Sequence, residues 1–469
     1  MFKKLLSVLL LVALVGGGFS AGLASSEAQS GEEITVLAPE SYRDLIEALV
    51  NSYNSDAAPT LTLIFAESAA MMDQIADADI VIYEDFRQDP PIDFECGVIS
   101  RAYAVLPELG ARYLASEDCG DYVAPKTLLL VEFLDFIVSP DGQQVAIDLG
   151  YLPDSVEIED QAGVTVVVPQ PVRKIVAAYG VSTYLVYALG AGDELSAASY
   201  LGVRSEITEQ RMAAIDANYL EAAEAVSEIG QRAVNMEEMA ALDPDLILAS
   251  SRTQWLDTAA ELDIPIVRFE GESPELLQDA MLMLGTVLGP NAAYRAEEFN
   301  AYYNDTLDII VSETSDVLDP PKVYFSGTAP LIVASGEMYQ TAMIEAAGGT
   351  SVSDELVGFW NDVNLEQVLV WDPDVIFVPT YGGANVEAFT ESEEWSLVNA
   401  VDRGNVYQLP QFVAPWDTPG PDSILGIIWM AGILYPDQLG LSCAEQAVYF
   451  YGMFYDYSLD MEVAQELCG

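Results

Sequence analysis

The chain has 469 residues, of which 75 are acidic and 17 basic, giving a formal net charge of -58 at pH 7. A surface this negative repels other polyanions, which excludes general binding to nucleic acid or to anionic lipid. The hydrophobic content of 51% excludes an intrinsically disordered chain. The sequence contains no His, which excludes Ser-His-Asp and Cys-His catalysis and every His-ligated zinc or haem site.

Residues 1–30 predict a signal peptide. Two lysines precede a mainly apolar run from Leu5 to Val15, which is too short to span a bilayer. Small residues follow the run and place the cleavage site near Ala24 or Ala28. No Cys follows that could carry a lipid anchor, so we expect a periplasmic or extracellular protein. A retained anchor helix is the alternative.

The four cysteines fall into two pairs that are local in the sequence. In an exported protein this pattern predicts two disulfides, Cys96–Cys119 and Cys443–Cys468. No Cys-x-x-Cys motif is present, so we expect no thiolate metal site and no bound metal or cofactor.

Residues 31–155 alternate between strand and helix patterns. Strands are expected at 34–38, 61–66 and 78–83, and helices at 42–53, 69–75 and 128–150. Strands that alternate with helices are typical of a parallel α/β sheet.

The segments ITVLAPES, FAESAAMMDQIADADIVIYED and FIVSPDGQQVAIDLGYLP of this region resemble type II binding proteins of the molybdate and phosphate kind. The second lobe of that family is missing, so the resemblance implies a truncated lobe. Ser41 and Ser68 match positions that bind an oxyanion in the family, at expected helix N-termini whose free N–H groups favour anions. The alternative is that both serines only cap helices.

A second α/β architecture follows the first. Strand and helix patterns alternate over residues 156–272, and a long helical stretch, interrupted by Gly289-Pro290, covers residues 273–320. A second α/β series covers residues 321–469.

An internal repeat links these two series. Asn235-Met-Glu237 precedes Asp243-Pro-Asp-Leu-Ile, and Asn364-Leu-Glu366 precedes Asp372-Pro-Asp-Val-Ile at the same spacing. Each copy predicts a short helix, a turn and a buried strand. The matched spacing indicates a duplicated architecture.

Residues 160–469 resemble the class III substrate-binding proteins of ABC importers, which capture siderophores, vitamin B12 and haem. The stretches that carry the resemblance are VTVVVPQPVRKIVAAYGVSTYLVYALGAGDEL, NMEEMAALDPDLILAS, YQTAMIEAAGGTSV, WNDVNLEQVLVWDPDVIFVP and NVYQLPQFVAPWDTPGPDSILGIIWMAGILYP. The family implies two Rossmann-like α/β lobes joined by a long backbone helix, here preceded by the separate truncated α/β lobe.

The resemblance implies a non-enzymatic protein that captures a small-molecule metal chelate and delivers it to an ABC permease dimer. A ferric siderophore is the leading ligand, with a corrinoid or haem as alternatives. A free oxyanion or a nickel chelate is also compatible. A surface scaffold or adhesion protein with the same fold is the non-transport alternative. Catalysis is disfavoured because no nucleophile–base set is present.

Ligand-binding residues are expected where strands end, because ligands of parallel α/β lobes lie beyond the carboxyl ends of the strands. Trp360 and Trp416 match positions where relatives place aromatic rings over the ligand, and arginines suit the oxygens of a chelate. For each aromatic residue the alternative is core packing, and for each arginine it is a surface ion pair. The candidates are Tyr179, Ser182, Tyr200, Arg204, Arg252, Trp255, Tyr339, Trp360, Tyr381 and Trp416.

Glu237 and Glu366 occupy the same position in the two copies of the repeat. Class III relatives use matching glutamates to dock on arginines of the two permease subunits, which implies one acidic anchor per lobe. The alternative is that both are ordinary exposed helix residues, and Glu238 next to Glu237 complicates the assignment.

Overall fold

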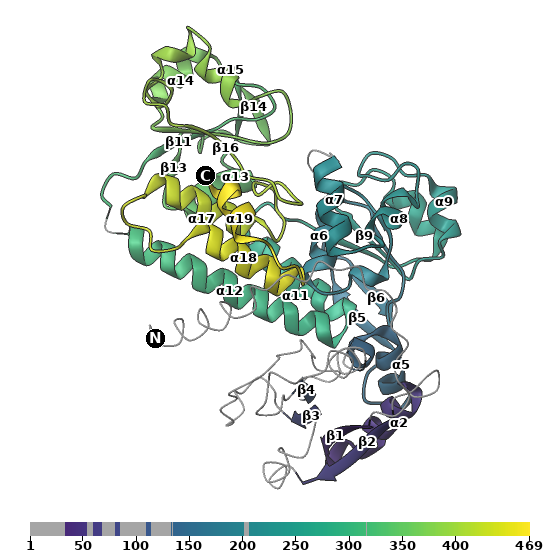
Figure 1. Cartoon of the computed structure of the whole chain (residues 1–469). Coiled ribbons are helices and arrows are strands. Elements are labelled where there is room, and N and C mark those ends of the chain that lie inside the picture. The colour runs from purple at the N-terminus through teal and green to yellow at the C-terminus, as the bar shows by residue number, and fades with distance from the viewer. Residues whose placement is uncertain are drawn as a thin grey trace.

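The computed structural model describes residues 33–53, 60–67, 80–84, 109–113, 133, 135–200, 206–315 and 317–469. These residues form an N-terminal unit followed by two α/β lobes, which we call the N-lobe and the C-lobe (Figure 1). The expected signal peptide and its cleavage site lie outside the described residues. None of the described helices is long and apolar enough to cross a membrane.

The N-terminal unit contains a four-stranded sheet with the order β2-β1-β3-β4. The strands β1, β2 and β3 are parallel, as expected, whereas the sequence did not predict β4, which pairs antiparallel to β3. Its core is formed by buried apolar residues of α2, of the three parallel strands and of the segment 133–146 that leads into and includes α5. The elements are β1 (Glu33–Pro39), α2 (Arg43–Tyr53), β2 (Thr60–Ala66), β3 (Ile80–Glu84), β4 (Leu109–Tyr113) and α5 (Pro140–Asp148).

The N-lobe is built on a parallel sheet with the order β10-β9-β7-β8, preceded by the antiparallel pair β5 and β6. All five residues of the central strand β9 are buried, which agrees with a strand covered on both faces. The elements are β5 (Ser155–Glu159), β6 (Thr165–Pro169), β7 (Ile175–Ala177), α6 (Gly180–Ala188), β8 (Leu195–Ala198), α7 (Glu206–Ile215), α8 (Tyr219–Glu224), α9 (Met236–Ala241), β9 (Leu246–Ser250), α10 (Leu256–Ala259) and β10 (Ile266–Phe269).

The C-lobe repeats this design with the order β13-β11-β15-β16, again parallel, and adds the antiparallel pair β12 and β14. Its elements are β11 (Lys322–Phe325), β12 (Ile332–Ala334), α13 (Tyr339–Ala346), β13 (Thr350–Ser351), β14 (Trp360–Asp362), α14 (Leu365–Trp371), β15 (Val375–Val378), α15 (Val386–Thr390), α16 (Asn399–Asp402), β16 (Val406–Gln408), α17 (Ser423–Leu434), α18 (Cys443–Phe454) and α19 (Met461–Cys468).

The duplicated motif folds the same way in both lobes. The strands β9 and β15 that follow it occupy the same place in the two sheets. Asp243 and Asp372 both adopt the left-handed conformation, with φ of 51° and 53°. Lys174 and Lys322 each donate from Nζ to a carbonyl at the end of the motif helix, on Leu242 at 3.1 Å and on Trp371 at 3.5 Å. The repeat therefore extends to individual hydrogen bonds.

The helical stretch 273–320 is not one bridging helix, and in this respect the expectation is wrong. It forms α11 (Pro274–Leu288) and α12 (Pro290–Thr314), which reverse direction at Gly289. Asn300 donates to the carbonyl of Gln278 at 3.2 Å, which places the two helices antiparallel. Gly289 has φ of +105°, a conformation that favours glycine, and Pro290 then starts the second helix.

The long helix that bridges the two lobes is α12. Its buried Arg295 donates from Nε to the carbonyl of Ala188 at the end of α6 in the N-lobe, at 3.1 Å. The same guanidinium donates to the carbonyl of Phe454 at the end of α18, at 2.8 Å. Further along, α12 contacts α17 of the C-lobe. In Figure 1 this helix runs beneath the C-lobe toward the N-lobe.

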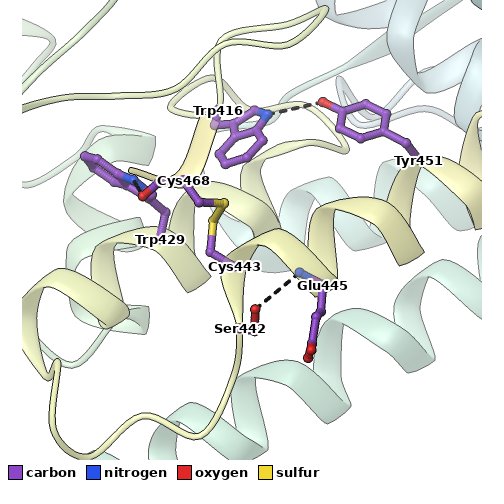
Figure 2. Close-up of a disulfide and its surroundings, with 7 residues drawn as sticks. All are labelled: Trp416, Trp429, Ser442, Cys443, Glu445, Tyr451 and Cys468. Carbon is purple, nitrogen blue, oxygen red and sulfur yellow. Dashed lines mark hydrogen bonds between the residues drawn. A yellow bond between two sulfur atoms is a disulfide. The ribbon is translucent and has the colours of Figure 1, made fainter. Parts of the chain in front are cut away.

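The expected disulfide Cys443–Cys468 is confirmed, with the two Cα atoms 5.9 Å apart. It joins the first residue of α18 to the last of α19, and Figure 2 shows Trp429 of α17 beside it. The Trp429 indole donates to the carbonyl of Cys468 at 3.2 Å. The other expected pair, Cys96 and Cys119, lies outside the described residues.

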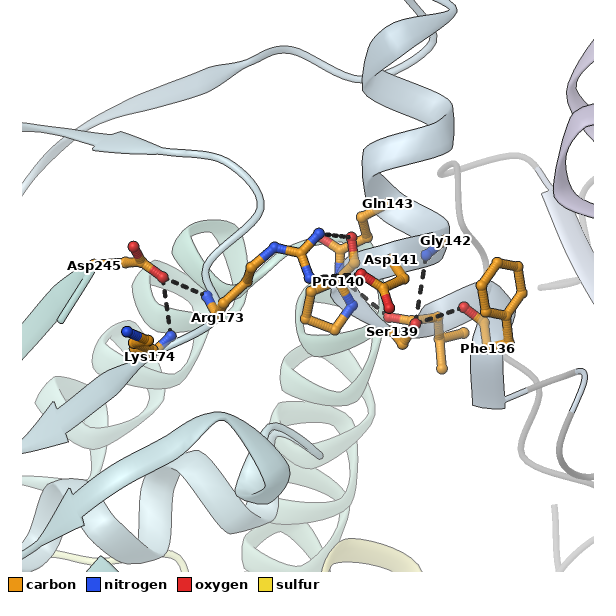
Figure 3. Close-up of polar contacts among 10 residues, drawn as sticks. Phe136, Ser139, Pro140, Asp141, Gly142, Gln143, Arg173, Lys174 and Asp245 are labelled. Atoms are coloured by element: carbon orange, nitrogen blue, oxygen red, sulfur yellow. Dashed lines mark hydrogen bonds and ion pairs between the residues drawn. The ribbon is translucent and has the colours of Figure 1, made fainter. Parts of the chain in front are cut away.

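An ion pair attaches the N-terminal unit to the N-lobe (Figure 3). Arg173 contacts Asp141 in the first turn of α5 at 2.6 Å and donates to the carbonyl of Pro140 at 3.3 Å. The backbone N–H groups of Arg173 and Lys174 both donate to Asp245, at 2.8 and 3.0 Å. The same short segment thus binds α5 on one side and the turn of the repeat on the other.

Candidate functional site

The two lobes meet through the loops that follow the carboxyl ends of their strands. Arg252, in the loop after β9, lies with its Cζ 4.9 Å from the ring of Phe359 in the C-lobe. Tyr200, beyond β8, donates to the carbonyl of Val413 at 3.4 Å. We call this contact zone the interlobe seam. It comprises Tyr179, Tyr200, Arg211, Arg252 and Glu272 of the N-lobe with Phe359, Tyr381 and Gln411 of the C-lobe, and we include Gln340 and Asp417, which contact Tyr381, and Trp360, which follows Phe359 in the chain.

Three of the residues on the N-lobe side of the seam were expected from the sequence, namely Tyr179, Tyr200 and Arg252. Tyr179 is half-buried at the N-cap of α6, and burial raises the pKa of its hydroxyl to about 12. Arg252 forms an ion pair with Glu272 at 2.6 Å, and its side chain remains 38% exposed. Because Glu272 already neutralises Arg252, this guanidinium is less free to bind an anionic ligand than the sequence suggested.

On the C-lobe side, Tyr381 and Trp360 are both half-buried. The Tyr381 hydroxyl donates to Oδ2 of the fully buried Asp417 at 2.7 Å. Trp360 packs against Gly327, where a Cβ atom would lie only 2.7 Å from the indole. The absence of a side chain at Gly327 therefore allows the Trp360 ring to lie against the backbone at this position.

Several expected ligand-binding residues are core residues instead. Trp416 is fully buried and donates to the Tyr451 hydroxyl at 3.2 Å (Figure 2). Tyr339 is fully buried against Ser423 at 2.6 Å. Trp255 is 8% exposed, packs within a core cluster and donates to the carbonyl of Gly230 at 2.7 Å. The prediction that these three rings face a ligand is wrong, because core packing encloses them.

Ser182 is also buried, and its hydroxyl donates to the carbonyl of Tyr179 at 2.5 Å within the first turn of α6. Its expected contact with a ligand is wrong for the same reason. Arg204 and Ser68 lie outside the described residues. Ser41 lies in a short 3-10 turn, Glu40–Tyr42, that continues directly into α2, so it is near the N-terminus of a helix as expected, and its binding of an anion stays a prediction.

Sequence reasoning missed Arg211 on α7. Its Nη1 donates to the carbonyls of Gln411 and Phe412 at 3.0 and 2.9 Å, and its Cζ lies 4.6 Å from the Phe412 ring. Its position within a helix gave no sign that it reaches the other lobe. In a chain with only 17 basic residues, the scarcity of Arg was the available signal.

Buried side-chain oxygens without a protein hydrogen-bond partner recur where strands end. Among the described residues, three such oxygens follow strands of the two lobes, on Ser199, Thr253 and Ser326, and two lie on the seam, on Gln340 and Asp417. Unpartnered atoms on Gln231, Asn291 and Asn300 lie elsewhere. A buried unpartnered polar group costs about 1–3 kcal/mol. Such groups are retained where something other than the protein satisfies them.

In the described part of the chain, no group of three or more acidic or cysteine side chains is placed to hold a metal ion. The seam is instead lined by aromatic rings, one ion pair and individual polar groups. Such a lining can contact the flat faces of a small molecule and bind its polar groups by hydrogen bonds.

The two repeat glutamates lie in equivalent, exposed places. Glu237 is in the first turn of α9 and Glu366 in the first turn of α14, each after an Asn that caps the helix. The structure distinguishes Glu237 from its neighbour, because the Glu238 carboxylate accepts from the N–H of Ser227 at 2.6 Å and turns back to the lobe.

The fold and the seam define a two-lobed binding protein, and the comparisons agree. Residues 175–412 match the periplasmic binding protein family, and the chain belongs to this family. Its members include substrate-binding components of ABC transporters. The resemblance over residues 160–469 and the α/β fold class are thereby confirmed.

Three similar proteins show the range of the family. The molybdate-binding protein MolA of Haemophilus influenzae is 25% identical over 231 residues, which are 44% of this chain and 65% of that protein. The vitamin B12-binding protein of Yersinia pestis is 26% identical over 253 residues, which are 52% of this chain and 78% of that protein. The solved structure of Helicobacter pylori CeuE with Ni(II) bound matches with a TM-score of 0.56 at 18% identity, over 66% of this chain and 99% of that chain.

Proposed function

We propose that this protein captures a metal chelate, in particular a ferric siderophore, at the interlobe seam and delivers it to an ABC permease dimer outside the cytoplasm. The observation that carries the proposal is the set of buried unpartnered oxygens at strand ends of both lobes. The half-buried rings of Tyr179, Trp360 and Tyr381 add apolar faces at the same place. Binding without catalysis is sufficient for this role.

A chelate suits the seam better than a bare metal ion. The sequence has no His, and transition metals are most often held by His or Cys in proteins. A chelate brings its own ligands to the metal and presents a large, partly apolar surface, which suits aromatic side chains. A corrinoid is the second candidate, supported by the relative named as a vitamin B12-binding protein.

Docking on the permease is proposed for Glu237 and Glu366. Both carboxylates are exposed on helices that occupy the same place in the two lobes. A pseudo-twofold protein that meets a twofold permease dimer presents one equivalent anchor to each subunit.

The test is isothermal titration of the full chain with ferric hydroxamate, catecholate and carboxylate chelates and with cyanocobalamin. At least one ferric chelate is expected to bind, and Trp360→Ala is expected to weaken its binding by about 1–3 kcal/mol. Trp255→Phe is the matched control, because Trp255 is buried in the N-lobe core and its loss is expected to leave affinity unchanged. Binding of cyanocobalamin alone would favour the corrinoid, and no binding by any compound would refute capture and favour a scaffold or adhesion role.

A further inference from the structure

Asp417 and Gln340 form a buried pair of acceptors on the C-lobe side of the seam. Asp417 is 0% exposed and Gln340 is 5% exposed. They contact each other, because Gln340 Nε2 donates to the backbone carbonyl of Asp417 at 2.9 Å. Asp417 Oδ1 and Gln340 Oε1 have no protein donor within hydrogen-bond geometry, although the Gln340 side chain and the backbone N–H of Asp417 lie close enough to the carboxylate to counteract part of the rise in its pKa.

The missing partner must be a donor, because both free atoms are acceptors. A carboxylate oxygen and an amide oxygen together suit a positively charged group that carries several N–H bonds. Burial disfavours the charged carboxylate and raises the pKa of Asp417 to about 6, so the site is destabilised in its ionised form until a cation arrives.

The pair contacts Tyr381, another residue of the seam. Tyr381 is half-buried, and its hydroxyl occupies the second oxygen of Asp417 at 2.7 Å. Tyr179 of the N-lobe is close enough to Tyr381 to act on its charge. Tyr381 therefore covers Asp417, and a ligand amine has to displace the Tyr381 ring to reach this carboxylate.

We propose that Asp417, with Gln340 and Tyr381, binds a protonated amine carried by the chelate, so that the protein selects cationic over neutral or anionic chelates. This inference rests on the proposed function and specifies its substrate class. The nearby charges agree with it: Glu272 and Asp417 of the seam and Glu270, which acts on Tyr179, are three carboxylates against the two guanidiniums of Arg211 and Arg252.

The test uses two ferric chelates that differ in one group. Ferric desferrioxamine B carries a free ammonium group, and N-acetylation removes its charge without changing the iron ligands. At about pH 7.5 the wild-type protein is expected to bind the ammonium form about tenfold to a hundredfold more tightly, as for a charge-assisted hydrogen bond. Equal affinity for the two forms would overturn the inference.

Asp417→Asn is expected to abolish the preference, because the amide keeps the shape of the side chain and removes its charge. Asp422→Asn is the matched control: Asp422 is an equally buried carboxylate nearby, but Tyr451 and Tyr455 donate to its two oxygens. The control is expected to keep the wild-type preference. A preference that survives in Asp417→Asn would contradict the assignment.

A measurement on the wild type decides the matter even if Asp417→Asn does not fold. The preference is expected to decline as the pH falls below about 6, where Asp417 becomes protonated while the amine stays charged. Tyr381, which donates to Asp417, and Tyr179, which acts on Tyr381, stay neutral in this range because burial raises the pKa of both; Arg252, Glu270 and Glu272 are the charged groups around Tyr179. A preference that does not change with pH would also contradict the inference.

The outcomes separate the inference from the proposed function. Binding of a ferric tricatecholate but of neither desferrioxamine form would leave chelate capture standing and overturn the amine site. Failure of every chelate to bind would refute both.

Discussion

The disulfide between α18 and α19 allows a stability change to be calculated from the structure. Cys443 and Cys468 are 25 residues apart, and cross-linking them restricts the unfolded chain. The chain-entropy relation for a loop of this length gives a stabilisation of about 3.5 kcal/mol at 25 °C. The double substitution Cys443→Ser with Cys468→Ser is therefore expected to lower the free energy of unfolding of the C-lobe by about this amount.

Urea unfolding followed by tryptophan fluorescence is a suitable assay, because Trp429 donates to the carbonyl of Cys468 and reports on this part of the C-lobe. The midpoint is expected to fall and the slope of the transition to rise slightly, because the unfolded chain without the cross-link is less compact and exposes more surface. As a control, the double variant is also unfolded in the presence of a reductant, which acts in this variant only on the expected Cys96–Cys119 bond. A loss below about 1 kcal/mol would refute the loop-entropy reasoning and indicate that the packing of α19 alone holds the C-terminus.

Three further predictions concern charge and domain organisation. Burial raises the pKa of both Asp417 and Asp422 to about 6, so the folded protein takes up protons there at a pH where the unfolded chain does not. The midpoint of its thermal unfolding, measured by calorimetry, is therefore expected to rise as the pH is lowered from about 7.5 to about 5.5, and a fall would contradict this. Glu237→Arg with Glu366→Arg is expected to keep chelate affinity but abolish transporter-stimulated ATP hydrolysis; a wild-type rate would show that neither glutamate is an anchor. Deletion of residues 31–155 is expected to leave chelate affinity, measured by titration, unchanged within tenfold. The reason is that this unit has its own core and contacts the N-lobe through α5. A larger loss of affinity would mean that the unit completes the site.

Much of the fold could be predicted because its signals are local. The Asn caps at Asn235 and Asn364, the Pro turns and the buried strands after them depend on neighbouring residues. Two copies at one spacing were therefore enough to predict two similar lobes, and the two sheets do have the same strand order. The same local reasoning located the break at Gly289.

The candidate site was predicted less well, because membership of the seam depends on which face of each loop turns toward the other lobe. Trp360 and Trp416 were equally good candidates in the sequence. Trp360 is half-buried at the seam, whereas Trp416 is fully buried against Tyr451. Arg211 was missed because its partners, the carbonyls of Gln411 and Phe412, belong to the other lobe.

By itself, the sequence determined the composition, the duplicated α/β architecture and the family, since periodicity, capping and turn residues act over a few positions. Only the tertiary structure decided that the chain reverses between α11 and α12, so that the long bridging helix is α12. It likewise decided that Asp417 and Gln340 lie together with unpartnered oxygens behind Tyr381. The physical reason is that burial and pairing depend on contacts between segments far apart in the chain, which no local pattern records.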